Sequence, residues 1–505
     1  MPNIHKNLYL SQETLAAVFV MLFTSVFIVA QLVIGFQLSL FAVAMLVSAV
    51  LIFWRPRAGL YASTVLTLLF ERFYTLQPIL VGRASYKLYP IDIFLGVVFV
   101  AVAIRLVFRR TSLRLRSADW LLIGFLAFIT ALFAKDLFVV GDGSSMSTAF
   151  STWKNYFFYG LLYFAVPLLL QNEERLSRFV KVFLAGSVTA ILFVVIGIAR
   201  GEGLWTQFTP LSTDGVRILA LPHAYYFSMA LLAVVFSLRY IRQRYDAGSR
   251  VAFLLFASLP FWMVGIVGSL MRHLWIGVIF SVGMMWFILP KASKQSLMNL
   301  FRVSLLSFIA VGIVVAYGIA LFPYSQISTD AAQIGTAVSN RLLSLGDSGD
   351  TSISWRTYVW REATEAFVQS PVLGTGFGAR IPVEIDTYRE FIEIRNVHNS
   401  WLAMLVQIGV VGFGLILFFI GKTTAFVRKN IFRSEFLNSV RYATLGVFFF
   451  QCMVFLYQPY LETNLLGIFF WLNLGVMRTL SYIADTDASA LVRAKTIAPS
   501  NLPVI

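Results

Sequence analysis

Residues 251–289 have the sequence VAFLLFASLPFWMVGIVGSLMRHLWIGVIFSVGMMWFIL, an apolar run with Arg272 and His273 near its middle. As one α-helix this run would be about 58 Å long at 1.5 Å per residue, roughly twice the ~30 Å hydrocarbon core of a bilayer. We therefore expect two membrane helices that fold back on each other. Arg272 then lies at the tip of the hairpin.

The composition of the whole chain agrees with this picture. Of 505 residues, 59% are hydrophobic and 13% are charged, and the mean hydropathy is +0.79. A soluble domain has about half apolar and about a quarter charged residues, so this chain has too little polar sequence to cover a water-exposed surface. Apolar runs of helical length recur, whereas the short alternating segments of a membrane barrel do not. The fold class predicted is all-α, a polytopic membrane protein.

Windows of about 19 residues locate the individual spans. They lie near residues 15–34, 36–54, 59–78, 91–108, 119–134, 155–170, 179–199, 219–238, 251–270, 273–290, 302–322, 400–421, 442–458 and 464–483. The third, fifth and sixth are the weakest, so we expect about 12 to 14 transmembrane helices. The polar N-terminus runs into the first span without a small-residue cleavage site, which favours a retained helix over a signal peptide.

The orientation follows from the basic residues. Most of the 40 Lys and Arg residues, including every dense cluster, fall in alternate connections on the side of the N-terminus. The positive-inside rule therefore predicts that both termini are cytoplasmic. The predicted organisation is transmembrane helices 1–11 over residues 1–323, an extracytoplasmic loop with short amphipathic helices over 324–399, helices 12–14 over 400–483, and a cytoplasmic tail over 484–505.

Several function classes are disfavoured. The net charge of +16 follows from membrane topology and does not indicate a nucleic-acid partner. The single cysteine, Cys452, and four scattered histidines argue against a disulfide framework or a metal cluster, and no cofactor is predicted. No internal repeat and no acidic residue in the middle of a strong span are found, which disfavours a carrier or channel.

Two arginines in outer segments are candidates for anion binding. Arg272, at the hairpin tip, is either a cation that binds an anion at a cavity mouth or an arginine that reaches the interface beside Trp275. Arg356 falls in a predicted helix over 355–369, capped by Ser354 and ending before Pro371. Its partner there is either a protein carboxylate or a bound phosphate.

The helical periodicity of this segment separates its charged residues into two sets. At 100° per residue, Arg356 shares one stripe with Trp360, Ala363 and Phe367, whereas Arg361, Glu362 and Glu365 fall on the opposite side. Arg361 therefore has the pattern of an ordinary solvated charge, and Arg356 is the exception.

A histidine and a third arginine complete the candidates. His398 precedes the apolar helix expected over 400–421, where a helix N-terminus attracts anions and an imidazole can exchange a proton near neutral pH. A structural role for a lone histidine is the alternative. Gly409, Gly412 and Gly414 in that helix would allow close packing. Arg217 lies shortly before Pro222-His223 and is, like Arg272, a candidate for anion binding, although its sequence pattern is less specific.

A glycine-rich segment, Pro371-Val372-Leu373-Gly374-Thr375-Gly376-Phe377-Gly378, follows the predicted 355–369 helix. It follows a helix instead of a strand, so it is not a dinucleotide-binding fingerprint. We predict a tight turn that ends the helix. A nest of backbone amides that binds phosphate is the alternative.

Taken together, these segments resemble the O-antigen ligase and polymerase superfamily over residues 200 to 420. The motifs are His398-Asn399-x-x-Leu402 with Gly409-x-x-Gly412, Arg356 and Trp360 with Pro371-Val372-Leu373-Gly374-x-Gly376, Ser269-x-x-Arg272, and Arg217 with Pro222-His223. They occur in the order and topology of the family. Gln407 departs from it, since many members carry Glu there, and no role is assigned to that position.

The resemblance implies a glycosyltransferase of the GT-C type in the bacterial cytoplasmic (inner) membrane. Such enzymes transfer a glycan from undecaprenyl diphosphate to another lipid-linked repeat unit (polymerases) or to a lipid A core sugar (ligases), with inversion and without a metal. It further implies that Arg272, Arg356 and Arg217 bind the diphosphate, and that His398, with Asn399, positions or deprotonates the acceptor or assists phosphate binding. Arg272, Arg356 and His398 are then the catalytic candidates.

The partners implied are the lipid-linked donor, the glycan or lipid A core acceptor, the bilayer and a chain-length regulator, with no nucleic acid. Between the two activities the polymerase is slightly favoured, because nothing in the outer loop is tailored to a bulky lipid A core. A lipid-linked glycan transporter or flippase, and a protein O-oligosaccharyltransferase, are the alternative functions.

Overall fold

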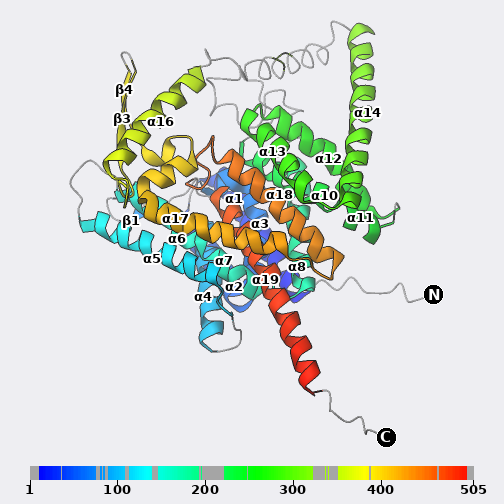
Figure 1. Cartoon of the computed structure of the whole chain (residues 1–505), viewed down its shortest axis with the longest axis horizontal. Coiled ribbons are helices and arrows are strands. Elements are labelled where there is room, and N and C mark those ends of the chain that lie inside the picture. The colour runs from blue at the N-terminus through cyan, green and yellow to red at the C-terminus, as the bar shows by residue number, and fades with distance from the viewer. Residues whose placement is uncertain are drawn as a thin grey trace.

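The computed structural model describes residues 11–35, 37–75, 80–81, 84–85, 89–108, 113–138, 146–192, 195, 221–246, 248–321, 336, 339, 351–385, 388–462 and 466–497. Helices dominate these ranges (Figure 1). The helices are α1 (Gln12–Ile34), α2 (Leu38–Trp54), α3 (Pro56–Thr75), α4 (Pro90–Val107), α5 (Ser117–Phe138), α6 (Met146–Gly160), α7 (Leu162–Leu169), α8 (Glu173–Thr189), α10 (Leu221–Phe236), α11 (Leu238–Arg244), α12 (Arg250–Gly268), α13 (Arg272–Ile288), α14 (Lys291–Leu321), α16 (Thr351–Gln369), α17 (Ser400–Lys429), α18 (Glu435–Val454) and α19 (Leu466–Ile497).

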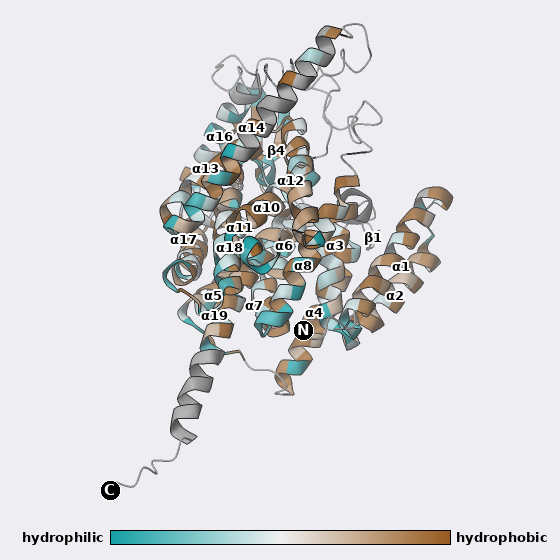
Figure 2. Cartoon of the chain, turned by 90° about the vertical axis from the view of Figure 1, so that its right-hand side faces the viewer, coloured by the Kyte–Doolittle hydropathy of each residue, from teal (hydrophilic) through white to brown (hydrophobic). Residues whose placement is uncertain are grey.

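Within the described residues, each predicted span overlaps a helix or, for residues 155–170, the pair α6 and α7, and the spans near 59–78, 179–199 and 219–238 lie partly outside these residues. Among the described residues, six helices are long and apolar enough to cross a membrane, or seven if α10 and α11, bent by 62°, count as one span. Two more apolar helices, α2 and α13, are shorter. Figure 2 shows how apolar residues cover much of the bundle, α1 and α2 included. The all-α, multi-pass membrane class is thus confirmed, and the count of 12 to 14 crossings stays a prediction.

The apolar run 251–289 folds as expected, into helices α12 and α13 joined by a tight turn. Ile266 closes the turn, because its carbonyl accepts hydrogen bonds from Ser269 Oγ at 2.7 Å and from Trp275 Nε1 at 3.0 Å. The Trp275 side chain therefore stabilises the turn of the hairpin, in addition to any contact that it makes with the membrane interface. Arg272 is the first residue of α13, at the tip predicted for it.

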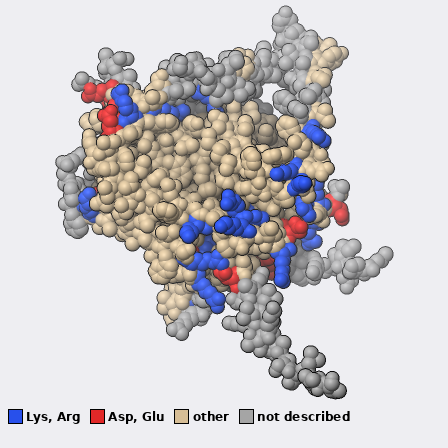
Figure 3. Space-filling view, viewed as in Figure 1, with Lys and Arg blue, Asp and Glu red and all other residues tan. Residues whose placement is uncertain are grey.

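Contacts between connections agree with the predicted alternation of sides. On the predicted inner side, Arg57 pairs with Glu13 at 2.6 Å and Ser434 donates to Glu173 at 2.8 Å. On the predicted outer side, Thr148 donates to Glu393 at 2.6 Å. Lys and Arg on the face drawn in Figure 3 lie mostly below and to the right of a broad uncharged expanse. Which side faces the cytoplasm remains an expectation from the positive-inside rule, as do the domain boundaries.

Two buried ion pairs join the bundle near its two surfaces. Lys154 of α6 pairs with Asp92 in the first turn of α4 at 2.5 Å, and Tyr159 also donates to Asp92 at 2.6 Å. Arg478 of α19 pairs with Asp119 in the first turn of α5 at 2.8 Å. Both carboxylates lie at helix starts and have a cationic partner, as buried charges require. The two ion pairs therefore give Asp92 and Asp119 a structural role.

The outer segment contains strands that the sequence analysis did not predict. Helix α16 is followed by an antiparallel hairpin of β3 (Arg380–Ile385) and β4 (Tyr388–Glu393), in which Ile381 pairs with Ile392, and then by the short 3-10 helix η3 (Ile394–Asn396). A second, smaller hairpin joins β1 (Leu80–Val81) to β2 (Ala84–Ser85). The expected short helices of the long loop are thus joined by two strands, over residues 380–385 and 388–393, that were not predicted.

Helix α16, the β3–β4 hairpin and the start of α17 share a small hydrophobic core at one end of the molecule (Figure 1). Its buried members are Val359, Ala363, Ile381, Val383, Ile392, Ile394, Val397, Ala403 and Val406. Because Ala403 and Val406 belong to α17, this core is continuous with a membrane helix. The outer segment is thereby fixed to the bundle beside residue 398.

Candidate active site

Helix α16 presents the two faces that its periodicity predicts. Ala363 is fully buried and Trp360 and Phe367 pack against the small outer core. Arg361 is 62% exposed, pairs with Glu362 at 3.2 Å and lies over the Tyr358 ring. Arg356, in contrast, is half-buried, and its charge acts on His398. The prediction that Arg356 differs from Arg361 is confirmed by this placement.

Two tryptophans of α16 join Arg356 to the residues before α17. The indole of Trp355 meets the imidazole of His398 edge to face, with ring centroids 5.2 Å apart and planes at 90°. Trp360 Nε1 donates to the carbonyl of Val397 at 2.8 Å. The sequence neighbours of Arg356 are thus packed against His398 and its neighbour Val397.

His398 lies on an unusual turn at the start of α17. Its φ is +55°, and among the described non-glycine residues only Leu270, two positions before Arg272, shares a positive φ, of +54°. Left-handed backbone at a branched or bulky residue is uncommon and clusters at functional sites. Asn399, the next residue, caps α17 by accepting a hydrogen bond from the Leu402 amide at 3.0 Å. Its suggested part in positioning an acceptor stays a prediction.

The surroundings of His398 favour the neutral imidazole. Burial and the nearby Arg356 guanidinium lower its pKa from 6.5 to about 4, although a hydrogen bond with the Gln458 side chain acts in the opposite direction. Nδ1 is buried and has no hydrogen-bond partner within the described part of the chain. His398 is therefore uncharged at neutral pH, with one ring nitrogen available for a ligand.

Residues 455–462, between α18 and α19, link His398 to the Arg272 hairpin. Gln458 contacts His398, and Tyr460, whose amide donates to the Gln458 carbonyl at 2.9 Å, bonds His273 Nε2 through its hydroxyl at 2.6 Å. His273 follows Arg272 directly. One short segment thus contacts both the turn that carries His398 and the helix start that carries Arg272.

Sequence reasoning missed residues 455–462 entirely. Within the segment, Glu462 is 4% exposed, and it accepts hydrogen bonds from Ser400 Oγ at 2.6 Å and from the Tyr156 hydroxyl. The signal available in the sequence was a carboxylate between two apolar spans on the predicted outer side. The contact of Glu462 with Ser400 cannot be predicted from the sequence, because the two residues are far apart in the chain and meet only in the folded bundle.

The glycine-rich segment 371–378 is docked against a break in α17. At Gly409, where φ is +61°, the helix opens, and Thr375 N donates to Val406 O at 2.9 Å, Gly376 N to Gln407 O at 3.0 Å and Val410 N to Pro371 O at 2.9 Å. The amides of Gly374 and Phe377 also have protein acceptors, Ser370 O and Asp136 Oδ2. With these amides used internally, the phosphate-nest alternative is wrong, and the segment ends α16 as a turn, as predicted.

The glycines in this region have different roles. A Cβ at Gly374 would lie 2.4 Å from Gln407 C and O, and one at Gly409 would lie 2.2 Å from Val372 O, so both positions require glycine. Gly412 packs on Phe128, as close packing predicted, whereas a Cβ at Gly414 would meet no atom of the described residues within 4 Å. The expectation of close packing is therefore wrong for Gly414. Arg217 lies outside the described residues.

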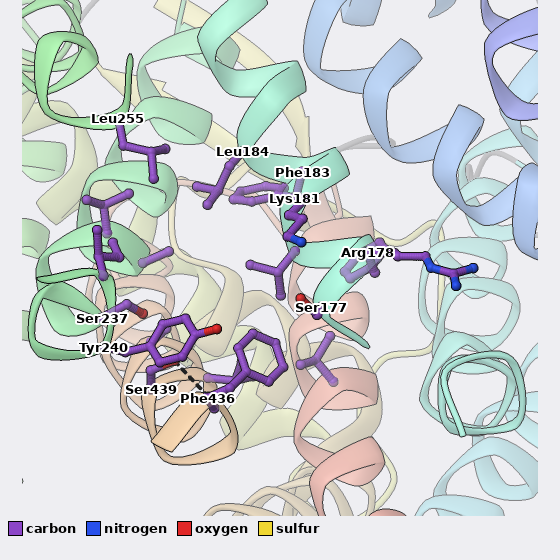
Figure 4. Close-up of a pocket in the computed structure, with 18 of the residues that line it drawn as sticks. Ser177, Arg178, Lys181, Phe183, Leu184, Ser237, Tyr240, Leu255, Phe436 and Ser439 are labelled. Carbon is purple, nitrogen blue, oxygen red and sulfur yellow. Dashed lines mark hydrogen bonds between the residues drawn. The ribbon is translucent and has the colours of Figure 1, made fainter. Parts of the chain in front are cut away.

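A separate cavity of about 1400 Å³ lies between α8, α10, α11, α12, α18 and α19 (Figure 4). Apolar side chains such as Leu184, Leu255 and Phe436 line it, the hydroxyl of Tyr240 points into it, and the guanidinium of Arg178 points away. Its rim belongs to the predicted inner side. None of Arg272, Arg356 and His398 lines it, so it is distinct from the site described above.

Comparison with known proteins identifies the region that holds this site. Residues 245–417 match the family model described as O-antigen ligase, and no curated protein matches the chain. The matched region runs from the residues before α12 to the middle of α17 and includes Arg272, Arg356 and His398. The match confirms, for residues 245–417, the resemblance to the O-antigen ligase and polymerase superfamily that the motifs indicate.

Proposed function

We propose that the chain transfers a glycan from undecaprenyl diphosphate to a sugar acceptor at the outer face of the bacterial cytoplasmic membrane. The observation that carries the proposal is the placement of Arg356 beside a neutral, half-buried His398, with Arg272 joined to the same site through residues 455–462. The O-antigen ligase match over residues 245–417 supports a reaction of this general type.

The reaction balances without any further reactant. The acceptor hydroxyl oxygen attacks the anomeric carbon of the donor glycan, and the bond from that carbon to the diphosphate oxygen breaks. The leaving diphosphate keeps the bonding electrons, and the hydroxyl proton passes to a base. A single displacement from the opposite face inverts the anomeric centre. What the protein must supply is a base for the proton and fixed positive charge for the leaving group.

His398 is suited to accept the proton. A base must be unprotonated before the reaction, and burial together with the Arg356 charge keeps the pKa of His398 at about 4. The unpartnered Nδ1 offers an acceptor atom for the hydroxyl proton. In the alternative role, as a phosphate ligand, His398 would instead donate a ring N–H to a phosphate oxygen.

Arg356 and Arg272 are suited to bind the diphosphate. Arginine remains charged in a partly buried site and donates two parallel hydrogen bonds to phosphate oxygens, which a lysine does not. Charge-assisted bonds of this kind stabilise negative charge most where water is excluded. Arg272 is the first residue of α13, where the helix dipole adds to the attraction of an anion, whereas Arg356 lies in the second turn of α16. No metal or cofactor is part of this proposal.

We favour a polymerase, in which the acceptor is a second lipid-linked repeat unit, over a ligase that uses a lipid A core. Within the described part of the outer segment, the elements are α16, one hairpin and one short 3-10 helix. Nothing in these elements is specialised for a bulky core acceptor. A chain-length regulator is the protein partner that a polymerase would have.

The test uses the purified full chain in lipid nanodiscs with a synthetic undecaprenyl-diphosphate oligosaccharide. Release of undecaprenyl diphosphate together with a lengthened lipid-linked glycan is the expected result. Transfer to a lipid A core or to a protein Ser or Thr would replace the polymerase with a ligase or a protein-glycosylating enzyme. In proteoliposomes, movement of the donor across the bilayer without any new glycosidic bond would contradict the proposal and support a flippase.

A further inference from the structure

The carboxyl group of Glu462 connects three parts of the bundle beside the proposed site. Its Oε2 accepts a hydrogen bond from Ser400 Oγ at 2.6 Å, and its Oε1 accepts one from the Tyr156 hydroxyl of α6. The Asn155 side chain also donates to the Glu462 backbone carbonyl at 2.6 Å. Glu462 therefore ties the 455–462 segment to α6 and to the first residue of α17, which lies two positions after His398.

Ser400 is held from several directions. Its amide donates to the Phe455 carbonyl at 2.8 Å, and its Oγ accepts from the Leu461 amide at 3.1 Å. The same hydroxyl lies 3.1 Å from the carbonyl of Gln458, the residue whose side chain contacts His398. A hydroxyl has one proton, so Ser400 can donate either to Glu462 or to the Gln458 carbonyl. The two acceptors compete.

The charge on Glu462 decides this competition. An ionised carboxylate is the stronger acceptor, and its contact with Ser400 Oγ is the shorter of the two. Once protonated, the carboxyl can donate its own proton to Ser400 or to Tyr156, and the Ser400 hydroxyl is then available to the Gln458 carbonyl. Protonation of Glu462 thus changes the hydrogen bonding of the residue that contacts His398.

We propose that ionised Glu462 is a positioning residue for the transfer reaction: through Ser400 and residues 455–462 it holds the His398 turn in its left-handed conformation and keeps Gln458 against the imidazole. This inference rests on the function proposed above. Glu462 contacts neither Arg356 nor Arg272 in any described interaction, so its effect on the reaction passes through His398. The left-handed turn at His398, with φ of +55°, is a conformation that surrounding contacts must maintain.

The titration of Glu462 supports a role near neutral pH. Burial raises the pKa of its carboxyl from 4.5 to about 7, against the hydrogen bonds from Ser400 and Tyr156 and the charge of Arg395, which lower it. The titratable and charged groups that face it are Tyr156 from α6 and Arg395 from η3. His398, with a pKa of about 4, does not titrate in that range. The two groups should therefore give separate effects on a pH–rate profile.

The test measures transfer by the full chain in nanodiscs, with the synthetic donor, from pH 5.5 to 8.5. Glu462→Gln removes the charge and keeps the size of the side chain, and Ser400→Ala removes the hydroxyl through which Glu462 acts. Glu365→Gln, at a position that is 63% exposed on α16, is the matched control. Melting temperature and size-exclusion profile are recorded for each variant.

Wild-type kcat should fall as the pH drops through about 7, while the control follows the wild type. Glu462→Gln and Ser400→Ala should lower kcat at pH 8 by about 10- to 100-fold, leave KM for the donor within about twofold, and remove the pH dependence near 7. If Glu462→Gln does not fold, Ser400→Ala alone carries the comparison. Both variants with wild-type kcat and a wild-type pH profile would overturn the inference. A wild type without any transfer would overturn the proposed function itself.

Discussion

The indole of Trp355 stands edge to face on the imidazole of His398, with 5.2 Å between the ring centroids. Because Trp355 precedes Arg356 on α16, this contact fixes the distance between a permanent cation and a titratable base. It also places both at the N-terminus of α17, where the backbone at His398 is left-handed. The pair thus combines a base kept neutral with a permanent cation.

Removing the Arg356 charge should raise the pKa of His398. A positive neighbour disfavours the imidazolium, so Arg356→Gln relieves one of the two causes that lower this pKa to about 4, and burial remains. We expect the titration midpoint of His398 to move upward, toward 6.5. NMR of protein labelled with 13C at histidine Cε1, with the His398 signal assigned from a His398→Gln sample, measures the shift. Arg361→Gln should leave the midpoint unchanged.

Arg272 should contribute to diphosphate affinity more than to folding. Arg272→Ala removes charge-assisted hydrogen bonds that contribute about 1.5 to 3 kcal/mol each, so we expect inhibition by inorganic diphosphate to weaken by about 10- to 100-fold. Arg272→Lys should recover part of the loss, since it keeps the charge without the planar fork. Inhibition constants in the transfer assay measure the effect. An unchanged inhibition constant in Arg272→Ala would remove Arg272 from the diphosphate site.

The break in α17 should be intolerant of a side chain at Gly409. An added Cβ would lie 2.2 Å from the Val372 carbonyl oxygen at a positive φ, so both overlap and backbone strain oppose it. We expect Gly409→Ala to destabilise the protein by about 2 kcal/mol or more. Thermal unfolding in detergent measures this, with Gly414→Ala in the same helix as the control. Equal melting temperatures for the two variants would contradict the role assigned to the break.

Much of the fold followed from local sequence patterns. The apolar runs predicted the helices because a span must be both long and apolar, and the length of 251–289 required the α12–α13 hairpin. The stripe in α16 separated Arg356 from Arg361 because helical periodicity depends on near neighbours alone. The β3–β4 hairpin was also detectable, since Ile381, Val383 and Ile385 alternate with polar or Pro residues, a period that indicates a strand.

The remaining features depend on contacts between distant segments. In the sequence, Gly409 resembles a glycine that allows two helices to pack closely. Its role as a helix break is evident only in the structure, where the Pro371–Gly376 segment lies against it. Glu462 is an isolated carboxylate in the sequence, and its burial arises because Ser400 and Tyr156 come from other helices. Gln458 likewise has no local signature. Sequence periodicity carries no information on such partners.

The central claim is that Arg356 and His398 act together in glycan transfer, and alanine variants test it most directly. Single-turnover transfer from the synthetic undecaprenyl-diphosphate donor is measured for wild type, Arg356→Ala, His398→Ala and Arg361→Ala at equal amounts of folded protein. Arg356→Ala and His398→Ala should each lower the rate by at least about 100-fold, whereas Arg361→Ala, whose side chain is 62% exposed, should match the wild type. Rates near wild type for either Arg356→Ala or His398→Ala would contradict the claim.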